Sequence, residues 1–144
     1  MDQTLYDIVK VYLAQMDSAI KISETICKHS EREELSGDDI ICGLIYRLMR
    51  PMSQDEIQLS LNKANTILND NYDSEDEEEE ENIMKNYEIP KISRKIKSNH
   101  CNCQVCCDVR VCLLNYKDHN PDDELAVRFK NSIEETCEKY KIYI

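Results

Sequence analysis

Hydrophobic side chains recur at steps of three and four along the first seventy residues, which is the period of an α-helix. One stripe predicts a long helix over residues 4–29. After a polar stretch, Ser36 offers an N-cap for a short apolar helix, Ile40 to Met49. We expect this helix to be the most buried element, with Gly43 allowing a neighbouring helix to approach closely. The first stripe consists of Leu5, Val9, Tyr12, Met16, Ala19, Ile22 and Ile26.

A third helix is predicted after Pro51, which ends the second. Ser53 and Glu56 have the spacing of a capping box, in which each side chain accepts a hydrogen bond from the other residue's backbone. Isolated short helices are marginal in water, so the three apolar faces need one another. The sequence therefore predicts a three-helix unit over residues 1–70. The third stripe consists of Ile57, Leu61, Ala64 and Leu68.

An acidic run divides the chain. Eight of the nine residues from Asp73 to Glu81 are acidic, and the whole chain carries a net charge of −11. Such a run repels itself and buries nothing, so we predict an acidic, disordered linker over residues 71–84. The alternative is an acidic arm that mimics nucleic acid or docks a basic partner.

The charge changes sign after this run. Residues 85–97 hold five basic side chains and the single acid Glu88. We interpret this segment as solvated and as neutralising the nearby acidic run. The alternative is a patch for phosphate or for an acidic partner. The basic residues are Lys85, Lys91, Arg94, Lys95 and Lys97.

Two further helices are predicted towards the C-terminus. Residues 104–116 fit both strand alternation and helical spacing, and we favour helix because no partner strand is visible. A last helix is predicted from an Asn120 cap with Pro121 at its first position. The fold class predicted is therefore all-α, with a Cys/His-rich unit over residues 85–144 that ends in this helix. Its stripe is Ala126, Phe129, Ile133, Cys137 and Tyr140.

A dense group of soft metal donors lies in this C-terminal unit. Cys103 and Cys106 form a Cys-x-x-Cys step that lets two thiolates reach one ion from a tight turn. Zinc prefers sulfur and imidazole donors in a closed tetrahedron. We predict a structural zinc site of Cys101, Cys103, Cys106 and His100. The alternatives for the fourth ligand are Cys112 and His119.

The other cysteines suggest different roles. Cys27, Cys42 and Cys137 lie in apolar helical stretches and are expected to be small buried side chains. The first residues show no secretory signal, so a disulfide framework is the poorer interpretation. Thiol redox chemistry or a nucleophilic cysteine with a histidine partner are alternatives, but nothing in the sequence selects one pair.

Two segments carry a resemblance to a known group of proteins. Residues 41–52, and Ile89–Ser93 leading into His100-Cys101-Asn102-Cys103 and Cys106, resemble small uncharacterised proteins of nucleocytoplasmic large DNA viruses, of the giant virus and iridovirus type. The resemblance implies a viral protein made in the host cell, located in the cytoplasm, the nucleus or the virion.

The N-terminal part also resembles the second half of a histone fold. A long helix, the loop over residues 34–40 and a short helix match the long helix, second loop and third helix of that fold. The loop region is acidic where DNA-binding histones are basic. The resemblance therefore implies pairing with another protein rather than DNA wrapping. We expect a protein partner, with a homodimer as the alternative.

Composition excludes several classes of protein. The two glycines form no phosphate-cradling loop, and no apolar run reaches the roughly 20 residues of a membrane span. A pI near 4.7 argues against a basic field over the whole protein.

From these features and the resemblances together, we expect a non-enzymatic viral protein-interaction module with a structural zinc site. The alternatives are a thiol- or zinc-dependent enzyme and a nucleic-acid-binding zinc protein.

Overall fold

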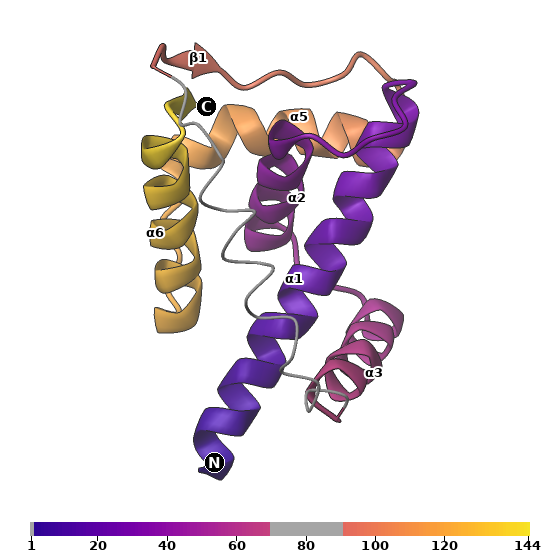
Figure 1. Ribbon diagram of the computed structural model, residues 1–144, viewed down its shortest axis with the longest axis vertical. Helices are drawn as coiled ribbons and strands as arrows, with labels where there is room; N and C mark the ends of the chain where they lie inside the picture. The colour runs from indigo at the N-terminus through magenta and orange to yellow at the C-terminus, as the bar shows by residue number, and fades with distance from the viewer. Residues whose placement is uncertain (1, 70–90) are drawn as a thin grey trace.

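The computed structural model describes residues 2–69 and 91–144, and this part of the chain is mostly helical (Figure 1). The all-α fold class is thereby confirmed. The acidic run of the predicted linker lies outside the described residues. The helices are α1 (Gln3–His29), α2 (Gly37–Met49), α3 (Gln54–Asn69), α5 (Gln104–Asn115) and α6 (Glu124–Lys139), with the 3-10 turn η2 (Tyr116–Asp118) and the strands β1 (Arg94–Lys95) and β2 (Ile142–Tyr143).

Local capping fixes where α2 and α3 start. The side chains of Ser36 and Asp39 each accept a hydrogen bond from the other's backbone N–H, which starts α2. Ser53 and Glu56 repeat this arrangement at the start of α3, as the sequence predicts. These reciprocal bonds satisfy backbone donors that a helix N-terminus otherwise leaves without partners.

The last helix begins later than the sequence predicts. Its N-cap is Asp123, not Asn120, so Pro121 lies ahead of the helix. The ammonium of Lys130, on the second turn of α6, donates hydrogen bonds to the carbonyl oxygens of Tyr116 and His119 at 3.3 and 2.5 Å. These bonds hold the chain leaving α5 alongside α6, and the helix starts only after the chain has turned.

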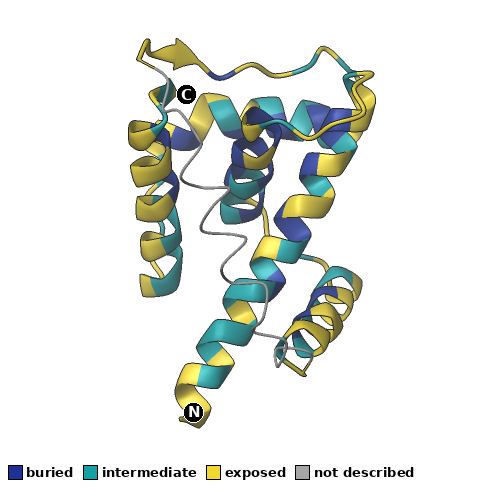
Figure 2. Cartoon of the chain, in the orientation of Figure 1, coloured by how far each residue is buried: buried dark blue, intermediate teal, exposed yellow. Residues whose placement is uncertain are grey.

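One hydrophobic core joins the two halves of the chain. The predicted units over residues 1–70 and 85–144 both contribute to it, and α2 packs against α1, α5 and α6. Figure 2 shows α2 as the most continuously buried helix, as expected from its sequence. The buried members of the core are Ile26, Ile41, Cys42, Ile45, Ile96, Val109, Cys112, Tyr116, Ile133 and Cys137.

The helices α1 and α2 pack closely against each other at Gly43. A Cβ built on Gly43 would overlap both the Ser23 hydroxyl and the Ala19 carbonyl. Ser23 donates its hydroxyl to that same carbonyl at 2.8 Å, so the obstructing groups are fixed. The expectation that Gly43 permits a close helix approach is confirmed.

An ion pair connects the start of α2 to a short sheet absent from the sequence prediction. β1 and β2 pair in parallel over two residues each. Arg94 in β1 donates to both carboxylate oxygens of Asp38 at 2.8 and 2.5 Å, and the Lys97 amide donates at 3.1 Å. Burial alone would raise the pKa of Asp38, but these hydrogen bonds bring it below its usual range.

The Gly43 contact gives a direct stability test. We expect Gly43→Ala to lower the free energy of unfolding by about 3 kcal/mol, because the added methyl group must separate α1 from α2. The matched control is Gly37→Ala, since a Cβ there meets nothing within 4 Å. Chemical denaturation should leave the control within about 1 kcal/mol of wild type. Equal stability of the two variants would contradict the packing described.

The Asp38–Arg94 pair makes the free energy of unfolding depend on pH. Because the folded state lowers the pKa of Asp38, its contribution is complete above about pH 5 and is lost as pH falls through the folded-state pKa. We expect the difference in unfolding free energy between wild type and Asp38→Asn to be largest at neutral pH and to shrink below about pH 4. Denaturant titrations across this range measure it. A difference that grows with acid would contradict the pairing.

Candidate metal centre

The first side chain of the centre is His29, the last residue of α1. The helix ends there because Glu31 adopts a left-handed backbone conformation, with φ of 60°. The N–H groups of Glu31 and Arg32 donate hydrogen bonds to the carbonyls of Lys28 and Cys27, at 3.1 and 3.2 Å respectively. This is a Schellman-type helix end, which fixes the backbone at His29 through two hydrogen bonds.

The three other side chains come from the start of α5 and the segment before it. Cys103 is the N-cap of α5, and its sulfur accepts a hydrogen bond from the Cys106 amide at 3.4 Å. The sulfur of Cys101 accepts from the Cys103 amide, also at 3.4 Å. The N–H donor from Cys106 and the positive end of the helix dipole favour the thiolate form of Cys103.

The four side chains converge on one point. The Nδ1 atom of His29 lies 3.1 Å from the sulfur of Cys103, 3.4 Å from that of Cys101 and 3.6 Å from that of Cys106. All four donor atoms lie within 4.8 Å of one another. Donors at zinc–sulfur and zinc–nitrogen bond lengths in a tetrahedron are separated by roughly 3.5–3.8 Å. The cluster therefore has the donor set and the size to hold a metal ion.

A second layer of hydrogen bonds holds the cluster in place. The amide group of Asn99 donates to the Cys106 sulfur and to the Ile26 carbonyl, both at 3.2 Å. Arg110 in turn donates to the Asn99 carbonyl at 2.9 Å and to the Cys107 sulfur at 3.3 Å. Asn99 thus links the last turn of α1 to the first turn of α5, the two elements that supply the donors. Such outer partners orient metal ligands and tune their basicity.

The thiols differ in how readily they ionise. The backbone hydrogen bond from Cys106 is the main cause that lowers the pKa of Cys103 to about 6. Burial is the main cause that raises the pKa of Cys106. Since metals bind the thiolate form, the lowered pKa of Cys103 favours metal binding at neutral pH, whereas the raised pKa of Cys106 opposes it.

The structure brings together three of the four residues in the predicted set. Cys101, Cys103 and Cys106 lie in the cluster, and the fourth donor beside them is His29. His100 is exposed and lines a hollow of about 410 Å³ that His29 and Cys101 also line. The alternatives Cys112 and His119 lie elsewhere, with Cys112 buried in the core and the partly buried His119 following η2.

Sequence reasoning missed His29 because its role depends on tertiary structure. His29 is 72 positions from Cys101, whereas His100 is adjacent to it. One weak signal existed, since His29 ends the predicted first helix and the chain has only three histidines.

The remaining buried cysteines serve the fold. Cys27, Cys42 and Cys137 are buried, as predicted. The Cys27 thiol donates to the carbonyls of Arg32 and Glu34 at 3.4 and 3.2 Å, which holds the loop after α1. Burial raises the pKa of Cys42 to about 12, so that thiol stays protonated at neutral pH.

None of the described helices has both the length and the apolar character to cross a membrane.

Comparison with known proteins adds no functional assignment. No protein-family model matches the chain, and neither the curated proteins nor the solved structures give a match.

Proposed function

We propose that this protein is a non-enzymatic interaction module whose two halves are joined by a structural zinc ion. The observation that carries the proposal is the convergence of His29 on the sulfurs of Cys101, Cys103 and Cys106. The ion would connect the end of α1 to the start of α5.

The donor chemistry supports zinc over harder cations. Three sulfurs and one imidazole nitrogen form a soft donor set, whereas calcium and magnesium take oxygen ligands. The imidazole presents Nδ1 to the sulfurs, so Nε2 is the nitrogen that keeps its proton when a metal binds. Ligation would contribute directly to folding free energy, because the unfolded chain has no preformed site.

The number of donors supports a structural role. Catalytic zinc sites keep one position for water or substrate, while structural sites have four protein ligands. Here four side chains lie close together, which is the number that a closed tetrahedral site needs. A zinc- or thiol-dependent enzyme would need one of them to leave.

A protein partner is supported by apolar side chains on the outer face of α3. Leu59 and Ile67 lie eight positions apart on this helix and are 61% and 41% exposed. Residues at this spacing share a helix face. Together with the sequence resemblance, this surface supports a viral protein that acts in the host cell or the virion by binding another protein or a second copy.

The zinc proposal is tested by replacing each of the two candidate histidines with alanine. We expect one zinc per chain in the purified wild-type protein and in His100→Ala, measured by native mass spectrometry with elemental analysis. His29→Ala and Cys103→Ser should each weaken zinc retention at least tenfold in a chelator competition, because three donors remain. The midpoint temperature of thermal unfolding should be lower in His29→Ala and Cys103→Ser than in wild type and His100→Ala.

The two histidine variants form a matched pair, since both remove an exposed imidazole. Zinc loss from His100→Ala with retention in His29→Ala would contradict the ligand set. Wild-type protein that purifies without metal, with stability insensitive to chelator, would contradict the zinc site itself.

A further inference from the structure

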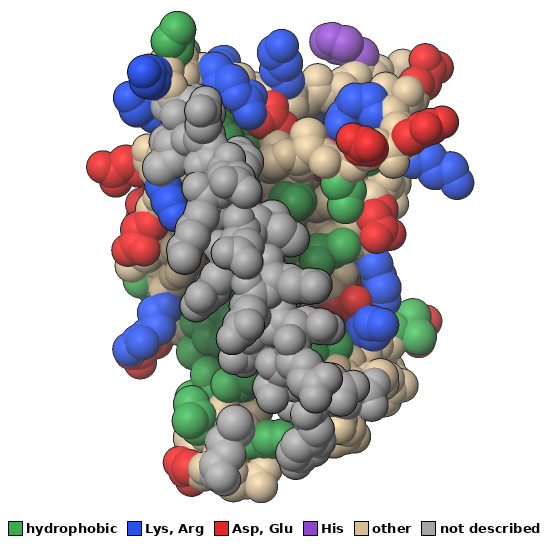
Figure 3. All heavy atoms as spheres, viewed as in Figure 1, with side chains coloured by type: hydrophobic (Ala, Val, Ile, Leu, Met, Phe, Trp, Pro, Cys, Tyr) green, Lys and Arg blue, Asp and Glu red, His purple; other side chains and the backbone are tan. Residues whose placement is uncertain are grey.

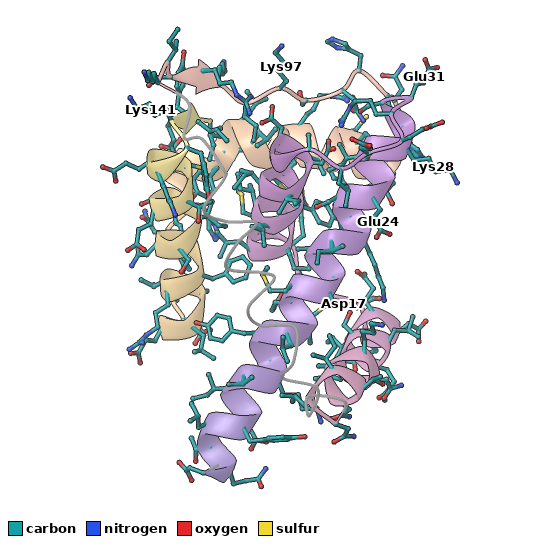
Figure 4. All side chains as sticks on the ribbon, viewed as in Figure 1. Asp17, Glu24, Lys28, Glu31, Lys97 and Lys141 are labelled. Atoms are coloured by element: carbon teal, nitrogen blue, oxygen red, sulfur yellow. The ribbon has the colours of Figure 1, made fainter. Side chains whose placement is uncertain are left out.

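The edge of the molecule around β1 is basic although the chain as a whole is acidic. Figure 3 shows Lys and Arg side chains gathered over this edge, and Figure 4 shows Lys97 pointing away from the helices there. We define the β1 surface by its exposed basic residues and one exposed aromatic ring. Its members are Lys91, Arg94, Lys95, Lys97, Lys117, Lys141 and Tyr143.

Several of these cations are available to a ligand. Within residues 2–69 and 91–144, no carboxylate pairs with Lys95, Lys97 or Lys117. The nearby acid Asp38 is already engaged by Arg94 at 2.5 Å. The positive charge of this surface is therefore only partly neutralised within the described protein.

A hollow of about 360 Å³ opens within the surface. Its polar lining includes Lys95, Ser98, Arg110 and Lys117. Lys95 and Lys117 come from β1 and from the turn after α5, so the fold places cations on two sides of one depression. The rest of the lining is apolar (Ile96, Leu113, Leu114 and Ile144), so the charged side chains of the lining are all cationic and favour an anionic group.

The structure also supplies an aromatic ring that is distant in sequence. Tyr143 pairs with Lys95 in the parallel β1–β2 register, and paired residues direct their side chains to the same face of a sheet. Tyr143 is 53% exposed. An exposed ring beside a basic track is the combination that binds single-stranded nucleic acid, because bases stack on the ring while lysines contact phosphates.

We propose that the β1 surface binds single-stranded nucleic acid, with Lys95, Lys97 and Lys117 at phosphates and Tyr143 stacked on a base. Duplex is disfavoured because its bases are already stacked on one another and cannot cover the ring. This binding function is additional to the proposed zinc-stabilised module. It rests on the zinc proposal only because the ion would hold the segment that follows β1.

Binding is measured by fluorescence anisotropy of labelled fifteen-nucleotide oligo-dT and oligo-U with the full-length, zinc-loaded protein. We expect binding that weakens with salt, by a slope of about 0.7 for each phosphate contact. Lys95→Glu should weaken affinity at least fivefold and reduce that slope. Tyr143→Ala should weaken affinity about tenfold, and Tyr143→Phe should restore it because the ring remains.

The charge control is Lys63→Glu, an equal change at an exposed position on α3. Equal losses from Lys95→Glu and Lys63→Glu, or no binding by wild type at 50 mM salt, would overturn the proposal. So would tighter binding of a duplex, or displacement by poly-glutamate as effective as by unlabelled oligo-dT, which would point to an acidic protein partner. Zinc content is measured on every variant. A variant that keeps its zinc but loses nucleic-acid affinity is altered at the β1 surface, whereas a variant that loses zinc is altered at the metal centre.

Discussion

The meeting of His29 with the three cysteines is the contact on which the rest of the arrangement depends. It joins residues 72 positions apart, where the end of α1 lies against the start of α5. Closing so long a loop costs chain entropy, and the cost grows only slowly with loop length. A metal–ligand set can offset that cost, because its binding free energy is realised only in the folded chain.

The hydrophobic core and the histidine–cysteine cluster connect the same two halves of the chain, the first by apolar packing and the second by polar contacts. α2 buries apolar side chains against α1, α5 and α6, and Gly43 lets α1 come close enough to complete the packing. The Asp38–Arg94 pair then ties β1 to the start of α2. The segment from β1 to α5 is therefore fixed at both ends, by an ion pair at one and by the cysteine cluster at the other.

Local chemistry made most of the fold predictable. The three N-terminal helices follow from apolar spacing and from caps such as Ser36 and Ser53, which act within four residues. The role of Gly43 was also predictable, since a glycine inside a buried helix has few other uses. The late start of α6 was not, because it depends on contacts from Lys130 to the preceding turn.

The candidate site was only partly predictable for the same reason. Three of the candidate ligands, Cys101, Cys103 and Cys106, lie within six residues, so their spacing indicates a site in the sequence. His29 reaches them only through the packing of α1 on α5. The pairing of Lys95 with Tyr143 is likewise invisible in the sequence, since each two-residue strand is too short to carry a pattern.

Zinc K-edge X-ray absorption on the purified full-length protein tests the central claim most directly. We expect three sulfur ligands at about 2.3 Å and one nitrogen ligand at about 2.0 Å around each zinc ion. A shell of four sulfurs, a shell containing a water oxygen, or a protein without bound zinc would contradict it.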